Sequence, residues 1–286
     1  MTAVQVAERP LSGSDAVATV RDLARTEAGR YARHPLFLIG TVVALVMAVP
    51  VVRTRDPDPL ALTILPAFFV GVFGFVVAHR LTTSLQRTAE LVGSTPSSQR
   101  RRTTALCLAC LVPLMAGVLI TVECLVLTAV DPPDVVPADG PMAWFGDYSW
   151  PVVVSALLAM GPVACLGGPL LGVAVARWAP FRGSALLGVV VLVVTCSTMA
   201  SGPQFPWRVM PPWAALSDER VEGGVILSST FPSAVSPVWY LVYTLLLCAL
   251  AVVAALLRDP RGRRPLLWTG AVLGVATAGA FVLALT

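Results

Sequence analysis

The chain has 286 residues, of which 56% are apolar and 13% charged, and its mean hydropathy is +0.80. Soluble domains carry about a quarter charged residues, so this composition excludes an ordinary soluble protein and indicates an integral membrane protein. All 20 basic residues are arginine, which excludes a Walker A phosphate loop, a Schiff-base lysine and a serine–lysine dyad, because each of these needs a lysine amine. If ATP drives this protein, a separate chain must hydrolyse it.

The N-terminal segment is polar and carries five arginines within its first 34 residues, so we expect it to stay in the cytosol rather than act as a signal peptide. Between residues 14 and 33, apolar residues recur every three or four positions, as in an amphipathic helix: Val17, Val20, Ala24, Ala28 and Tyr31. This spacing predicts an arginine-bearing helix in the inner membrane interface. The alternative is a helix that only fixes the topology of the chain.

Seven apolar segments follow that meet or approach the roughly 20 residues needed to cross a hydrocarbon core of about 30 Å. They cover residues 36–52, 60–78, 103–128, 152–176, 184–200, 238–257 and 266–285. The sequence therefore predicts an all-α, polytopic membrane helical bundle with six to seven transmembrane helices. A cytosolic N-terminus places 16 of the 20 arginines on the cytosolic side, which is the orientation that the positive-inside rule favours.

The segment between the second and third spans, residues 79–102, predicts a rigid cytosolic turn. Apolar residues at helical spacing predict a short amphipathic helix here: Leu81, Leu85, Ala89 and Val92. We expect this helix to end near Gly93, and Thr95 is biased away from helix because a proline follows it. A second short helix is then expected to lead into the third span.

The run from Glu90 to Pro96 and the arginines that follow it resemble the cytosolic signature of type-2 permeases of ATP-binding-cassette exporters. In that family, a Glu-Leu-x-x-(Ser/Ala)-Thr-Pro run followed by basic residues lies between the second and third helices. The resemblance implies that this segment is the coupling helix, which docks on an ATPase subunit. The residues that would contact that partner are Glu90, Leu91, Ser94, Thr95, Pro96, Arg100 and Arg101.

The resemblance covers about residues 14–258. The end of the N-terminal helix resembles the family's interface helix, whose basic residues would be Arg21, Arg25, Arg30 and Arg33. The stretch Pro211-Pro212-Trp213 resembles the family's external segment between its fifth and sixth helices. The resemblance implies a permease subunit in a bacterial inner membrane, with an ATPase subunit, a second permease subunit and the lipid bilayer as partners, and with no catalytic residue or cofactor of its own.

The expected organisation has three parts: a cytosolic N-terminus with the interface helix (1–34), the permease domain (35–258), and a basic turn with an extra transmembrane helix (259–286). The extra helix departs from the six-span pattern of the family and would place the C-terminus outside. The runner-up function is a stand-alone membrane scaffold or sensor partner without transport activity. A membrane enzyme comes third, because no catalytic side chains converge in the sequence pattern.

Several single residues also need an interpretation. Glu123 is the one carboxylate inside an apolar segment; it is expected near the outer boundary, in an interfacial or intersubunit hydrogen bond or along a substrate path. His34 and His79 are expected to anchor the membrane interface rather than bind a metal. The Cys107–Cys110 pair is expected to pack as small apolar residues. The basic clusters lie beside spans, so topology explains them, and no nucleic acid is expected as a partner.

Overall fold

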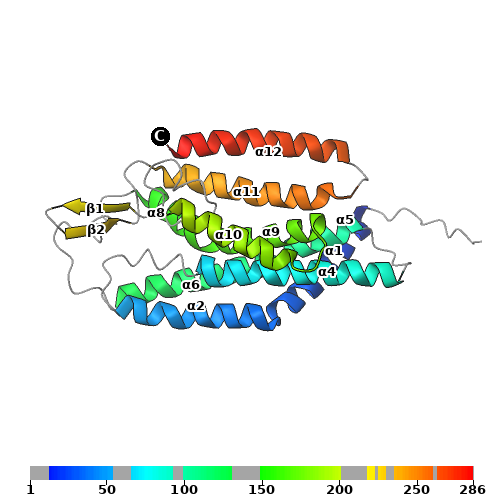
Figure 1. Cartoon of the computed structure of the whole chain (residues 1–286), viewed down its shortest axis with the longest axis horizontal. Helices are drawn as coiled ribbons and strands as arrows, with labels where there is room; N and C mark the ends of the chain where they lie inside the picture. Colours follow the sequence, from blue (N-terminus) through cyan, green and yellow to red (C-terminus); the bar gives the residue numbers. More distant parts are fainter. Residues whose placement is uncertain are drawn as a thin grey trace, which may run out of the picture.

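A computed structural model describes residues 13–53, 66–92, 99–130, 149–200, 218–222, 225–229, 235–259 and 263–285. Within these ranges the chain is almost entirely helical. The exception is an antiparallel hairpin of β1 (Asp218–Glu222) and β2 (Val225–Ser229), in which Asp218 pairs with Ser229 (Figure 1). The sequence analysis did not anticipate these two strands, which the all-α prediction leaves out.

The described part of the chain begins with two helices that meet at a sharp bend. α1 (Gly13–Ala32) and α2 (Pro35–Arg53) differ in direction by 61°. The break falls at His34 because the residue before a proline is disfavoured in helical conformation. The His34 amide instead donates to the Tyr31 carbonyl oxygen at 3.0 Å. The predicted interface helix over residues 14–33 is confirmed as a helix distinct from the first apolar segment.

The remaining helices follow in chain order. They are η2 (Ala67–Val72), α4 (Phe73–Val92), α5 (Gln99–Ala109), α6 (Leu111–Val130), α8 (Trp150–Leu158), η3 (Ala159–Val163), α9 (Ala164–Trp178), α10 (Ser184–Ala200), α11 (Pro237–Leu257) and α12 (Arg263–Ala284). η2 and η3 are wider π-helical turns. η3 contains Pro162, whose missing N–H interrupts the regular helical bonding.

Each of the seven apolar segments predicted from the sequence is helical where the structure describes it. Residues 60–65 of the second segment lie outside the described part. Among the described helices, five are long and apolar enough to cross a membrane, and the bent pair of α1 and α2 makes a sixth. α10 is apolar but shorter. The described helices are therefore compatible with a membrane helical bundle.

Successive long helices run in alternating directions, so the bundle has two distinct ends (Figure 1). The Ser236 amide donates to the Ala284 carbonyl oxygen at 2.9 Å, which places the end of α12 beside the start of α11. The Trp178 indole Nε1 donates to the Ala254 carbonyl oxygen at 2.8 Å, which places the end of α9 beside the last turns of α11. The described helix termini that carry most of the arginines all lie at one end, here called the arginine end.

The centre of the bundle is held by close approach of α9 to η2 and α4. A Cβ added at Gly168 would overlap the Gly71 carbonyl oxygen, and one at Gly172 would overlap the Phe75 carbonyl oxygen. Small residues at this spacing let two helix backbones approach closely. The Gly168-x-x-x-Gly172 pattern thus packs within the chain. By contrast, nothing in the described structure lies within 4 Å of a Cβ built on Gly274.

One element differs from its prediction. The amphipathic segment from Leu81 to Val92 is not a separate short helix but the continuation of the second span, because α4 runs without a break from Phe73 to Val92. From Phe75 to Val92 the sequence contains no glycine or proline that would interrupt the helix. Thr82 reinforces the continuity by donating its hydroxyl to the Ala78 carbonyl oxygen at 2.7 Å.

Candidate functional site at the arginine end

The second half of α4 projects beyond its neighbours at the arginine end. His79 Nε2 lies 2.7 Å from the Ser184 hydroxyl, so the first turn of α10 lies beside the middle of α4. From Arg80 to Val92, α4 extends about 20 Å further at 1.5 Å per residue. Figure 1 shows this end of α4 standing clear of the helices around it. A partner approaching the arginine end would contact this end of α4 before it contacted the neighbouring helices.

The residues of the predicted coupling segment fall partly within the described structure. Glu90 and Leu91 belong to the last turn of α4, where the backbone is described but the side chains are not. Ser94, Thr95 and Pro96 lie outside the described residues. The segment is bounded on its other side by α5, whose first turn carries Arg100 and Arg101.

α1 packs along α5 and joins the same end of the bundle. Its only deeply buried aromatic side chain in the described structure is Tyr31, which is 1% exposed and donates its hydroxyl to the Gly74 carbonyl oxygen at 2.9 Å. Tyr31 also makes an edge contact with Phe37, at 5.2 Å between ring centroids. α1 is therefore fixed at its C-terminal end to both α4 and α2.

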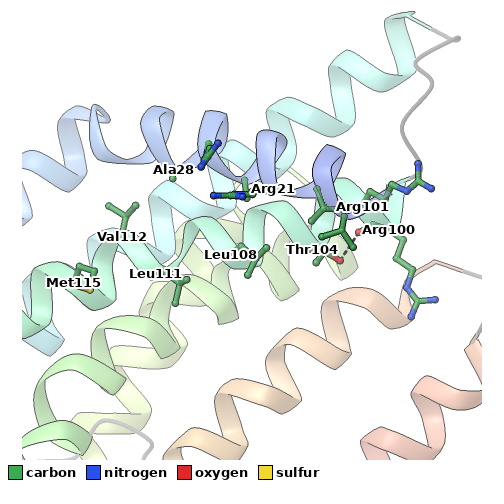
Figure 2. A pocket seen from close by; sticks show the side chains of 13 residues that line it. Arg21, Ala28, Arg100, Arg101, Thr104, Leu108, Leu111, Val112 and Met115 are labelled. Atoms are coloured by element: carbon green, nitrogen blue, oxygen red, sulfur yellow. Dashed lines mark hydrogen bonds between the residues drawn. The ribbon is translucent and has the colours of Figure 1, made fainter. Parts of the chain in front are cut away.

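Between α1 and the continuous α5–α6 pair lies a groove of about 900 Å³, shown in Figure 2. It is lined by the apolar stripe that the sequence predicted on α1 and by the exposed face of α5 and α6. The lining residues are Val17, Val20, Arg21, Ala24, Arg25, Ala28, Arg100, Arg101, Thr104, Leu108, Leu111, Val112 and Met115. The structure thus brings two interface-helix arginines and two coupling-segment arginines to one surface.

The other interface-helix arginines do not reach this groove. Arg30 forms a two-oxygen ion pair with Glu27, with its Nη1 at 3.0 and 3.1 Å from the two carboxylate oxygens. Glu27 is 6% exposed, so this pair is partly desolvated. Arg33 is exposed beside the bend at His34. Arg30 therefore helps to hold the helix in place, and nothing in the structure assigns a contact to Arg33.

Glu123 lies on α6, away from the groove and nearer the opposite end of the bundle. The side chain is half-buried. Its Oε2 atom is buried and has no hydrogen-bond partner among the described residues. The structure therefore does not join Glu123 to the arginine end.

Both histidines lie toward the arginine end of the bundle, and their predicted role as anchors of the membrane interface stays a prediction. His79 is stacked on Phe75, with 6.4 Å between ring centroids, and His34 Nδ1 accepts a hydrogen bond from the Leu36 amide at 3.3 Å. Partial burial and the nearby Arg80 guanidinium lower the pKa of His34 below its usual value.

No group of three or more histidine, cysteine, aspartate or glutamate residues in the described structure is arranged to hold a metal ion. All six cysteines are free, and Cys107 and Cys110 are buried.

The sequence analysis missed a polar junction where α9 meets the turn after α11. Arg177 is 3% exposed and interacts electrostatically with the opposite charge of Asp259, which is 8% exposed. The guanidinium of Arg258 lies 5.8 Å from the centre of the Trp178 ring. From the sequence alone, Arg177 was interpreted only as one of the arginines that set the membrane orientation. Its partner Asp259 lies about eighty positions further along the chain, in the turn after another helix, so the sequence pattern did not connect the two residues.

A second hollow of about 810 Å³ lies between α4 and the start of α10. Its lining is more polar and includes Arg80, Thr83, Ser84 and Arg182. The turn that leads into α10 contains Gly183 with φ of 96°, a conformation that side-chain-bearing residues rarely adopt. The described part of the arginine end thus includes two concave surfaces, one lined by α1, α5 and α6 and the other by α4 and the start of α10.

No known protein family, no curated protein and no solved structure matches this chain.

Proposed function

We propose that the chain is the membrane-spanning permease subunit of a type-2 ATP-binding-cassette exporter, which couples ATP hydrolysis by a partner ATPase to export of a substrate. The observation that carries this proposal is the packing of α1 along α5 at the end where α4 projects. The two helices that flank residues 93–98 and the amphipathic N-terminal helix therefore lie at the same end of the bundle. A partner docked at that end would contact both elements that the family resemblance assigns to coupling.

In this proposal the arginine end faces the cytosol. The described part of that end carries arginines on α1, on α4, on α5 and in the turns around α10 and α12. Cytosolic loops are enriched in arginine, so this orientation follows the positive-inside rule. The N-terminus is then cytosolic, all seven apolar helices cross a bacterial inner membrane, and α12 ends on the outer side.

The chain itself supplies a path and a mechanical linkage rather than a reaction. α4 is continuous from the centre of the bundle to Val92, and α5 and α6 form one helical stretch from Gln99 to Leu127 that is long and apolar enough to cross a membrane. A displacement applied near Glu90 is therefore carried directly into two membrane helices. With a second permease subunit, such a displacement would open a path between the two subunits. Glu123 is placed on that subunit contact or on the path.

Co-purification with an ATPase tests the proposal. A tagged full-length chain is expressed in its native host, and the associated proteins are identified. We expect an ATP-binding-cassette ATPase to be recovered with the unaltered chain, and Glu90→Arg to reduce its recovery at least tenfold, because the substitution reverses a charge on the docking surface. The matched control is Glu222→Arg, which makes the same charge change on β1 at the opposite end of the bundle.

Equal recovery of the ATPase with Glu90→Arg and Glu222→Arg would contradict the coupling assignment. Absence of any ATPase from the unaltered chain's preparation, together with recovery of another membrane protein, would instead favour the stand-alone scaffold.

A further inference from the structure

The groove between α1 and α5–α6 is lined mainly by two kinds of residue, arginines and aliphatic residues. Four of its residues are arginines, from α1 (Arg21, Arg25) and α5 (Arg100, Arg101), and none of the described residues that line it is acidic. Most of the others are aliphatic, and Thr104 hydrogen-bonds within its own helix, to the Arg100 carbonyl oxygen. The groove thus offers a strongly cationic part and an apolar part, with few other hydrogen-bonding groups.

The two parts are arranged along the groove. Figure 2 shows Arg100 and Arg101 at one end, Arg21 on the α1 side near Leu108, and Leu111, Val112 and Met115 toward the other end. From Thr104 to Met115 the helices rise about 16 Å. This length equals about the thickness of one leaflet, because the hydrocarbon core of a bilayer is about 30 Å thick. The apolar part therefore has the length of a lipid tail, Arg100 and Arg101 lie at the level of its headgroup, and Arg21 lies further in, near Leu108.

The apolar floor is open rather than covered by the bundle. Leu108, Leu111 and Met115 are 43%, 48% and 56% exposed. They belong to the Gln99–Leu127 helical stretch, which is long and apolar enough to span a membrane. In a bilayer the groove would open sideways into the leaflet at the arginine end.

We propose that this groove binds an anionic phospholipid of that leaflet, with its charged headgroup attracted by Arg100 at the end of the groove and by Arg21 further in, and an acyl chain lying along Leu108, Leu111 and Met115. Charge complementarity identifies the occupant: clustered guanidinium groups at a membrane surface favour anionic over zwitterionic headgroups. Arg25 contributes less, since its Nη1 lies 3.9 Å from the Asp22 carboxylate. The inference requires that the chain lies in a bilayer, but it does not require an ATPase partner.

The test uses the full-length chain, purified in a neutral detergent and depleted of lipid. Its thermal unfolding midpoint is followed while phosphatidylglycerol, or phosphatidylcholine with the same acyl chains, or inorganic phosphate is added. A ligand that binds the folded state raises the midpoint in a saturable way. We expect this for phosphatidylglycerol at much lower concentration than for phosphatidylcholine, and no equivalent rise with phosphate alone.

The headgroup contact is tested by Arg21→Gln/Arg100→Gln. Loss of two arginines near a charged lipid should weaken the apparent affinity for phosphatidylglycerol about tenfold or more. The matched control is Arg263→Gln/Arg264→Gln, which removes two exposed arginines from the first turn of α12 at the same end of the bundle. The control should keep the affinity of the unaltered chain.

The acyl contact is tested by Leu108→Trp, which narrows the groove without changing its charge, against Leu267→Trp at an exposed site on α12. Only Leu108→Trp should weaken lipid binding, and this comparison remains informative if the arginine variant does not fold. The proposal is overturned if phosphatidylcholine or free phosphate acts as well as phosphatidylglycerol. It is equally overturned if the groove variants bind like their controls. Recovery of an ATPase is unaffected by these results, so failure here is separate from failure of the proposed function.

Discussion

At the residue scale, two glycine patterns that look alike in the sequence have different surroundings in the structure. Gly168-x-x-x-Gly172 on α9 lies against the backbone of η2 and α4, whereas Gly274, the second glycine of Gly270-x-x-x-Gly274 on α12, faces open space. Small residues at this spacing let helices approach closely, either within one chain or between two chains. The first is now explained by internal packing, because no side chain fits between α9 and Phe75.

This difference predicts opposite effects of one substitution. Gly172→Ala should lower the free energy of unfolding by about 2 kcal/mol, because its methyl group overlaps the Phe75 carbonyl oxygen and the two helices must move apart. Gly274→Ala adds the same methyl group where nothing lies within 4 Å and should leave stability unchanged or slightly raised. Thermal unfolding of the two variants in detergent measures the contrast. Equal midpoints would contradict the close α4–α9 packing.

At the scale of elements, α1 packs along α5 and is buried most deeply near its C-terminal end. There the hydroxyl of Tyr31 bonds the Gly74 carbonyl oxygen across 43 residues of sequence, which ties α1 to α4. Further toward its N-terminus, α1 lies across the groove rather than against a filled core. The helix is therefore anchored most firmly near the bend and least firmly near Gly13.

Tyr31→Phe should accordingly weaken the attachment of α1. The substitution keeps the ring and its packing but leaves the buried Gly74 carbonyl oxygen without this donor, which costs about 1–2 kcal/mol. The expected result is a lower unfolding midpoint and faster proteolysis within α1. Thr269→Val is the control, because it removes a hydroxyl that bonds only within exposed α12, at Pro265. Similar losses in both variants would show that the Tyr31 bond does not hold α1.

The elements themselves were largely predictable, because long apolar runs and helical spacing are local properties of a sequence. The exceptions have physical reasons. The continuity of α4 past Ala78 was missed because a change from apolar to polar residues looked like the end of a helix, although no helix-breaking residue is present. The Arg177–Asp259 junction and the groove depend on which helices become neighbours, and a single sequence does not contain that information. The arginines of α1 and α5 were each identified, but their convergence on one surface was not.

At the scale of the whole molecule, the direction of the helices assigns the two termini of the described chain to different ends. α1 begins at the arginine end, and α12 finishes beside the start of α11 at the other end. α12 packs chiefly on α11, through a cluster that includes Tyr243, Ala280 and Phe281. An odd number of membrane crossings would give this arrangement.

A reporter fusion tests that number in cells. Alkaline phosphatase, which is active only outside the cytosol, should be active when fused after Thr286 and inactive when fused after Asp259, because α12 alone separates the two sites. The cytosolic reporter green fluorescent protein should give the reverse pattern. Inactivity of both phosphatase fusions would mean that α12 does not cross, and would return the chain to a six-span arrangement.

The 61° elbow at His34 has one more consequence. α1 has 20 residues and is about 30 Å long, so a tilt of about 10° about its anchored end would carry Gly13 through roughly 5 Å. The same tilt would barely shift Tyr31, which lies next to the pivot. A small rotation of α1 about the bend at His34 would thus produce a large displacement at Gly13, while the contacts of Tyr31 stay intact.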